Sequence, residues 1–242
     1  MGQKLDGIVF HGSGGLLYYY MGIAEYIQNY FDIENLKYCG VSGGCIPAFI
    51  LSIGIPVKKI WNECFIAWIN EKKKINSLFT ISVFNDESIK LLIKYLKMVL
   101  SQYAEEKAIR DINNKLSIRM SKVLLFGIKQ EYINKWSSFD DLLDCIIASC
   151  WVPAIFGSIT RTYKGSEYID GGFPKSIEDR GPRWLKIKVN TFQKINEDIK
   201  VLLYGSSLDL INSADIANKL YKQGYKDAEK NKKYFSDLIK KK

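Results

Sequence analysis

The sequence predicts an α/β fold built on parallel strands. Two short apolar runs, residues 5–10 and 36–41, are typical of buried strands. A glycine-rich turn and a helix-like run follow each of them. Because a strand–helix–strand connection is right-handed, these two strands are expected to be parallel, with both turns at the carboxyl edge of the sheet, where open α/β sheets bind ligands.

Helical periodicity accounts for much of the rest of the first half. Residues 16–30 repeat apolar side chains at helical spacing, and residues 57–136 are interpreted as a helical, lysine-rich section. Within that section, residues 86–103 carry a single apolar stripe with lysines on the other side. Such a helix either packs on the sheet or forms a lid or membrane-facing element.

The second half is expected to return to the sheet. Ser138, with Asp141 three residues later, resembles a capping box and predicts the start of a helix. Residues 158–163 and 166–169 flank Lys164-Gly165 and predict a hairpin. Further elements are expected as strands at 184–190 and 199–205 and as a helix from about 214 to 240.

Composition restricts the class of protein. The net charge of +9 is compatible with an anionic membrane surface, an acidic small molecule or solubility alone, whereas nucleic acid has no support beyond charge. Five cysteines without CxxC spacing are expected to be buried, reduced thiols, not a disulfide or zinc framework. The N-terminus shows no apolar signal-peptide core, so we expect a cytoplasmic protein, attached to membranes peripherally if at all.

The segment Gly40-Val41-Ser42-Gly43-Gly44 fits the pattern G-x-S-x-G. In this motif small neighbours let a sharp strand-to-helix turn expose the serine hydroxyl, and the following helix directs its N–H dipoles at a developing anion. Alone the motif is a weak signal. Its position between a strand-like and a helix-like run makes Ser42 a candidate nucleophile.

A serine nucleophile needs a base, and the only histidine is badly placed for it. His11 precedes Ser42, whereas α/β-hydrolases run serine, acid, histidine along the chain. Either the protein is inactive or its base is another residue. Asp170 ends a strand-like run and is followed by Gly171-Gly172, so it is the best candidate, with an ordinary β-turn as the alternative.

The glycine-rich turn at residues 12–15 offers backbone N–H groups for an oxyanion, since no bulky side chain blocks approach. The alternative is a nucleotide phosphate loop. Neither a Lys-Ser/Thr pair nor a completed G-x-G-x-x-G pattern supports that alternative.

Three elements in this order resemble the patatin-like phospholipase family. They are Gly12-Ser13-Gly14, the Gly40–Gly44 elbow and Asp170-Gly171-Gly172, supported by Gly22, by ASCWVPAIF at 148–156 and by GYKDA at 224–228. The resemblance implies one domain over residues 1–242, with a three-layer fold and a mostly parallel central sheet. It also implies a Ser42–Asp170 dyad, an oxyanion hole from the N–H groups of Gly12, Ser13 and Gly14, and no metal or cofactor.

The implied activity is hydrolysis of fatty-acyl esters, of the phospholipase A or lysophospholipase type, at a membrane surface. The chain departs from the resemblance at Leu16 and Leu17, where many relatives carry a basic residue and a glycine. These leucines affect the expected substrate more than the dyad. The alternatives are a catalytically silent lipid-binding protein, a neutral glyceride lipase and an acyltransferase.

Overall fold

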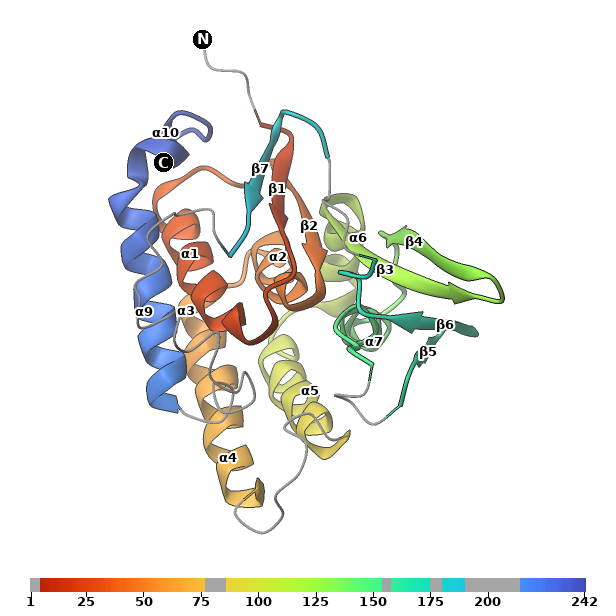
Figure 1. Ribbon diagram of the computed structural model, residues 1–242. Helices are drawn as coiled ribbons and strands as arrows, with labels where there is room; N and C mark the ends of the chain where they lie inside the picture. Colours follow the sequence, from red (N-terminus) through yellow and green to blue (C-terminus); the bar gives the residue numbers. More distant parts are fainter. Residues whose placement is uncertain (1–4, 77–85, 154–157, 175–179, 190–213) are drawn as a thin grey trace.

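The computed structural model describes residues 5–76, 86–153, 158–174, 180–189 and 214–242, and among them a seven-stranded mixed sheet (Figure 1). Strands β7, β1, β2 and β3 are parallel neighbours in that order, and the other three strands pair antiparallel. The predicted α/β fold is confirmed. The strands are β1 (Gly7–Phe10), β2 (Lys37–Val41), β3 (Leu116–Leu124), β4 (Gly127–Ile133), β5 (Arg161–Tyr163), β6 (Ser166–Ile169) and β7 (Trp184–Ile187).

Helices cover the sheet face that bears Ile8, Phe10 and Tyr38. Helix α2 contacts β1, β2 and β3, while α1 is covered on its outer side by α9 (Figure 1). The helices are η1 (Gly14–Leu16), α1 (Leu17–Tyr30), η2 (Ser42–Gly44), α2 (Cys45–Ile53), α3 (Val57–Ile60), η3 (Trp61–Phe65), α4 (Ile66–Asn76), α5 (Asp86–Leu100), α6 (Glu105–Lys115), α7 (Phe139–Ser149), α9 (Ala214–Lys230) and α10 (Lys232–Ser236).

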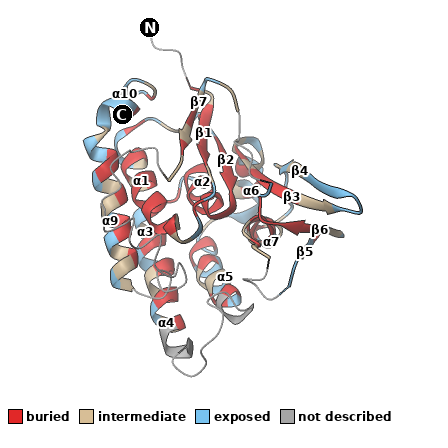
Figure 2. Cartoon of the chain, in the orientation of Figure 1, coloured by how far each residue is buried: buried red, intermediate tan, exposed pale blue. Residues whose placement is uncertain are grey.

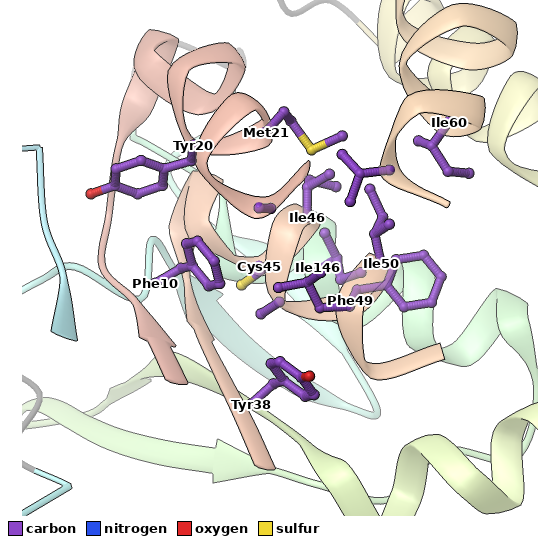
Figure 3. Packing of buried hydrophobic residues seen from close by; sticks show 14 of the residues in the cluster. Phe10, Tyr20, Met21, Tyr38, Cys45, Ile46, Phe49, Ile50, Ile60 and Ile146 are labelled. Atoms are coloured by element: carbon purple, nitrogen blue, oxygen red, sulfur yellow. The ribbon is translucent and has the colours of Figure 1, made fainter. Parts of the chain in front are cut away.

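One hydrophobic cluster joins the sheet to these helices. Figure 3 shows Phe10 and Tyr38 of the sheet beside Cys45 and Phe49 of α2. In Figure 2 the central strands and the inward sides of α1 and α2 are buried, whereas the outer side of α9 is exposed. The site therefore rests on a rigid support, because the strands and helices that carry it are fixed by close packing.

The register of β3 brings two distant strand ends together. Strand β4 pairs with β3 over residues 118–124 and so occupies one edge of β3. Strands β2 and β6 must therefore share the other edge, β2 ending with Val41 opposite Arg119 and β6 ending with Ile169 opposite Ser121. Because β2 runs parallel to β3 and β6 runs antiparallel, the carboxyl ends of β2 and β6 point at each other.

Several local predictions are confirmed. The Ser138 hydroxyl accepts a hydrogen bond from the Asp141 N–H at 3.1 Å and caps α7. The predicted hairpin is β5–β6, and its turn residues Lys164 and Gly165 both have positive φ, as a type I′ turn requires. All five cysteines are free, and only Cys150 is more than marginally exposed.

The interpretation of residues 57–136 as helical is wrong for its last part. Residues 116–133 form the β3–β4 hairpin, in which Leu116, Ile118 and Met120 alternate toward the core. The two-residue turn of this hairpin is apolar, so no glycine–asparagine pair marked it in the sequence. The strand predicted at 184–190 ends at Ile187, and the one predicted at 199–205 lies outside the described residues.

Candidate active site

Ser42 occupies a strained turn between β2 and α2. Its φ of 52° lies in the left-handed region that side chains rarely adopt, as expected for a nucleophile elbow. The turn fits only because glycine follows: a Cβ on Gly44 would lie 2.4 Å from the Phe10 carbonyl oxygen and 2.5 Å from that of His11. Gly40 is likewise pressed against the backbone of Cys45, with 2.4 Å left for a Cβ.

Asp170 meets Ser42 directly at the junction of β2 and β6. The Ser42 hydroxyl donates to Asp170 Oδ2 at 2.5 Å, and the Gly172 N–H donates to Asp170 Oδ1 at 2.7 Å. Both carboxylate oxygens are thus held in place. A Cβ on Gly171 would lie 2.2 Å from the Arg119 carbonyl oxygen, so only glycine lets the turn pass this close to β3.

The carboxyl of Asp170 is tuned by opposing effects. Burial raises its pKa above the ordinary value of 3.8, because the low-dielectric interior disfavours the charged form. The hydrogen bonds from Ser42 and Gly172 and the positive charge of buried Arg119 act in the other direction, and the raising effect prevails. A carboxylate with a raised pKa is a stronger base toward a hydroxyl proton than an exposed one.

The glycine-rich loop lies against the elbow. A Cβ on Gly12 would lie 3.6 Å from Ser42 Cβ, and one on Gly43 would lie 3.4 Å from the nitrogen of Gly14. Within the described part of the chain, the N–H groups of Gly12, Ser13 and Gly14 donate to no backbone acceptor. Two helix N-termini, those of η1–α1 and η2–α2, begin here, so the local field favours an anion.

His11 lies beside the elbow but takes no proton from it. It directly follows β1, and its pKa is lowered to about 4 by burial and by the charges of Lys188, Arg119 and Lys186. The imidazole is therefore neutral at pH 7. The Ser42 hydroxyl is directed at Asp170 instead.

Two contributors to the site, Ser149 and Arg119, were not identified from the sequence. Ser149 closes α7, and its Oγ accepts from the Ser42 N–H at 3.0 Å and donates to the Arg119 carbonyl oxygen at 2.7 Å. Its carbonyl also accepts from the Gly171 N–H at 2.8 Å. Ser149 thus connects the elbow, β3 and the Asp170 turn. The resemblance marks the segment 148–156 in the sequence but does not reveal this role.

Replacing Ser149 by alanine is expected to cost about 1–3 kcal/mol of stability and to lower kcat, because it leaves the buried Ser42 N–H unsatisfied and loosens the strained turn. Thermal unfolding and ester hydrolysis measure the two effects. Ser52→Ala is the matched control, since the Ser52 hydroxyl is equally buried but donates to Phe49 within α2. Equal kcat in the two variants would remove Ser149 from the site.

Leu16 and Leu17 differ in their surroundings. Leu16 is buried in the hydrophobic core, whereas Leu17 is half-buried at the start of α1.

A hollow of about 520 Å³ lies at the opposite end of the strands, and it does not include the dyad. The residues that line it are Leu5, Asp6, Asn35, Lys37, Arg183 and Trp184. Across the ranges given above, none of the helices combines the length and apolar content that crossing a bilayer requires.

The chain is similar to several curated proteins over about 70% of its length. It is 26% identical over 170 residues to the omega-hydroxyceramide transacylase of Mus musculus, covering 69% of this chain and 27% of that protein. It is 25% identical over 179 residues to human patatin-like phospholipase domain-containing protein 2, covering 72% and 34%. It is 20% identical over 178 residues to mouse 1-acylglycerol-3-phosphate O-acyltransferase Pnpla3, covering 72% and 41%. The chain thus spans less than half the length of each relative.

Solved structures share the fold at low sequence identity. VipD from Legionella pneumophila superposes with a TM-score of 0.51 at 13% identity, over 94% of this chain and 66% of that chain. ExoU, in its complex with SpcU from the type III secretion system of Pseudomonas aeruginosa, gives 0.50 at 12% identity, over 100% and 53%. The family model described as patatin-like phospholipase matches residues 8–175, which include the loop, the elbow and the Asp170 turn. The chain therefore belongs to the patatin-like phospholipase family.

Proposed function

We propose that the protein cleaves fatty-acyl esters of membrane lipids with a Ser42–Asp170 dyad, as a phospholipase A or lysophospholipase. The observation that carries the proposal is the 2.5 Å hydrogen bond from Ser42 Oγ to Asp170 Oδ2 at the end of two opposed strands. Membership of a family of lipid-acting enzymes supports the substrate class. The net charge of +9 favours an anionic membrane surface as the place of reaction.

Acylation begins when Asp170 Oδ2 takes the Ser42 hydroxyl proton while Oγ attacks the ester carbonyl carbon. The backbone N–H groups of Gly12, Ser13 and Gly14 stabilise the resulting oxyanion. When the intermediate collapses, the bond to the alcohol oxygen breaks, and the proton on Asp170 passes to that oxygen. Ser42 then carries the acyl group as an ester.

Deacylation repeats these steps with water. Asp170 takes a proton from the water molecule, whose oxygen attacks the acyl carbon. Collapse of the second intermediate releases the fatty acid, and Ser42 Oγ recovers its proton from Asp170. The dyad uses no metal in this scheme. Asp170 gives up each proton that it takes, so both Ser42 and Asp170 return to their starting protonation states after one turnover.

Acyl transfer to an alcohol is the second candidate. It is favoured by the relatives named as a transacylase and as acyltransferases, which are similar to this chain over about 70% of its length. The chemistry differs only in the acceptor that Asp170 deprotonates. A lysolipid or glycerol hydroxyl would then replace water in the second half of the reaction.

Product analysis distinguishes the two candidates and a silent lipid-binding protein. Incubated with phospholipid vesicles, the protein is expected to release free fatty acid that Ser42→Ala protein does not release. Added lysolipid or glycerol shifts the products to a new ester if transfer dominates. A fluorophosphonate probe should label wild type and spare Ser42→Ala, and a folded wild type that neither reacts with the probe nor releases acyl groups would contradict both enzymatic candidates.

A further inference from the structure

The turn that joins β3 to β4 is apolar, although hairpin turns are usually built from glycine, asparagine or aspartate. Leu125 and Phe126 form the turn and are 90% and 91% exposed. Leu124 and Ile128, each 44% exposed, extend the apolar surface behind them. The two turn side chains contribute nothing to the core, so their chemistry points to a partner outside the fold.

This apolar tip (residues 124–128) projects from the carboxyl edge of the sheet, where Ser42 lies. Strand β3 runs parallel to β2 and continues past Arg119, its partner opposite Val41, as far as Leu124. At about 3.3 Å per residue the tip stands roughly 20 Å beyond Arg119. Figure 1 shows the hairpin extending away from the body of the molecule, and Figure 2 shows its end exposed.

The base of the hairpin is bonded to the turn that carries Asp170. The Ser121 hydroxyl donates to the Phe173 carbonyl oxygen, and Gln130 Nε2 donates to the Pro174 carbonyl oxygen at 3.2 Å. The tip and the dyad are therefore held in a fixed relation. A surface that receives the tip is brought to the edge of the sheet at which the dyad lies.

The charges next to the tip are unfavourable for the isolated hairpin. Lys122 and Lys129 stand directly opposite each other in the β3–β4 register, and like charges in that position destabilise a strand pair. No carboxylate occurs between residues 122 and 130, although Glu131 lies 3.4 Å from Lys129. Two neighbouring lysines behind an apolar tip are complementary to a membrane surface, where anionic headgroups lie above the acyl chains.

We propose that residues 122–129 are a lipid anchor. Leu125 and Phe126 enter the boundary between headgroups and acyl chains, Lys122 and Lys129 contact anionic headgroups, and the dyad is thereby held over the bilayer. The inference rests on the proposed function for its substrate. A protein partner fits less well, because a projecting two-residue tip offers far less than the roughly 800 Å² that each side of a stable interface buries.

Flotation with vesicles tests the anchor without turnover if all proteins carry Ser42→Ala. With phosphatidylcholine–phosphatidylserine vesicles, Leu125→Ser/Phe126→Ser is expected to bind roughly tenfold more weakly or worse, because two buried apolar side chains are lost. Lys122→Gln/Lys129→Gln should weaken binding only when phosphatidylserine is present, and added salt should remove that difference. Unchanged flotation of the serine variant would overturn the proposal.

Met98→Ser is the matched control, since Met98 is 51% exposed on α5, the helix whose stripe suggested a membrane-facing element. It should float like the parent, and an equal loss would place the contact on α5 instead. A serine variant that changes elution on a sizing column but not flotation would assign the tip to a second copy of the chain.

Activity separates failure of the anchor from failure of the proposed function. With Ser42 restored, the Leu125→Ser/Phe126→Ser protein should lose hydrolysis of vesicle lipid about as strongly as it loses binding, and should keep hydrolysis of a soluble short-chain ester. Equal loss on both substrates would overturn the anchor. If even wild type cleaves no ester while flotation still depends on the tip, the anchor stands and the proposed function falls.

Discussion

Replacing Ser42 by alanine is expected to lower kcat for fatty acid release by about 10⁴-fold or more. The substitution removes the atom that would form the acyl-enzyme, and no other hydroxyl within the described residues is bonded to Asp170. Binding to lipid should persist, because the elbow backbone and the glycine loop remain. Fatty acid release from vesicles, together with a vesicle-binding measurement, checks both halves of this expectation.

Ser13→Ala is the informative comparison for Ser42→Ala. Both serines are buried within the site, but the role proposed for Ser13 uses its backbone N–H, which alanine retains. We expect the Ser13 variant to lose far less activity. Comparable losses in the two variants would mean that the Ser13 hydroxyl is required as well, and the role of Ser13 through its backbone N–H alone would have to be abandoned.

The parts of the site that lie within one short segment could be predicted from the sequence. Glycines on both sides of Ser42 and after Asp170 restrict the local backbone so strongly that the two turns are readable without a fold. The roles of Ser149 and Arg119 could not be read in this way. They depend on which residues of β3 face the ends of β2 and β6, and that register follows from the whole sheet.

The β3–β4 hairpin was missed for a related reason. Its turn residues Leu125 and Phe126 are apolar, and only Gly127, with a φ of 117°, marks the turn in the sequence. The lysines of the segment also matched the helical section before it. Where local sequence and local structure disagree, function is a common cause. The same two residues form the end of the anchor proposed above.

Asp170→Asn is expected to reduce kcat by about a thousandfold while leaving the protein at least as stable as wild type at neutral pH. The amide keeps the shape of the carboxylate, and its oxygen can still accept from the Gly172 N–H, but it cannot take the Ser42 proton. Because burial raises the pKa of Asp170, the folded protein loses stability when this carboxyl ionises. The asparagine side chain does not ionise, so the variant is free of this cost.

The pH dependence has a definite sign. Between the unfolded-state value of 3.8 and the raised folded-state pKa, the native protein binds more protons at Asp170 than the unfolded chain, so its stability falls as pH rises through that window. The stability difference between Asp170→Asn and wild type should therefore be absent below the window and constant above it. Wild-type kcat should rise through the same folded-state pKa, since only the ionised carboxyl can act as a base.

Asp227→Asn provides the matched control, because Asp227 is as buried as Asp170 but lies on α9, where it accepts from the Tyr19 hydroxyl at 2.9 Å and from Gln223 at 2.7 Å. This variant should lose stability and keep its kcat. Urea unfolding and ester hydrolysis across the acid range measure both quantities. An Asp170→Asn protein that is inactive but also clearly less stable at neutral pH would assign Asp170 a structural role. A catalytic carboxyl that is ionised in a buried site is expected to lower the stability of the protein, so its replacement by an amide should not destabilise the fold.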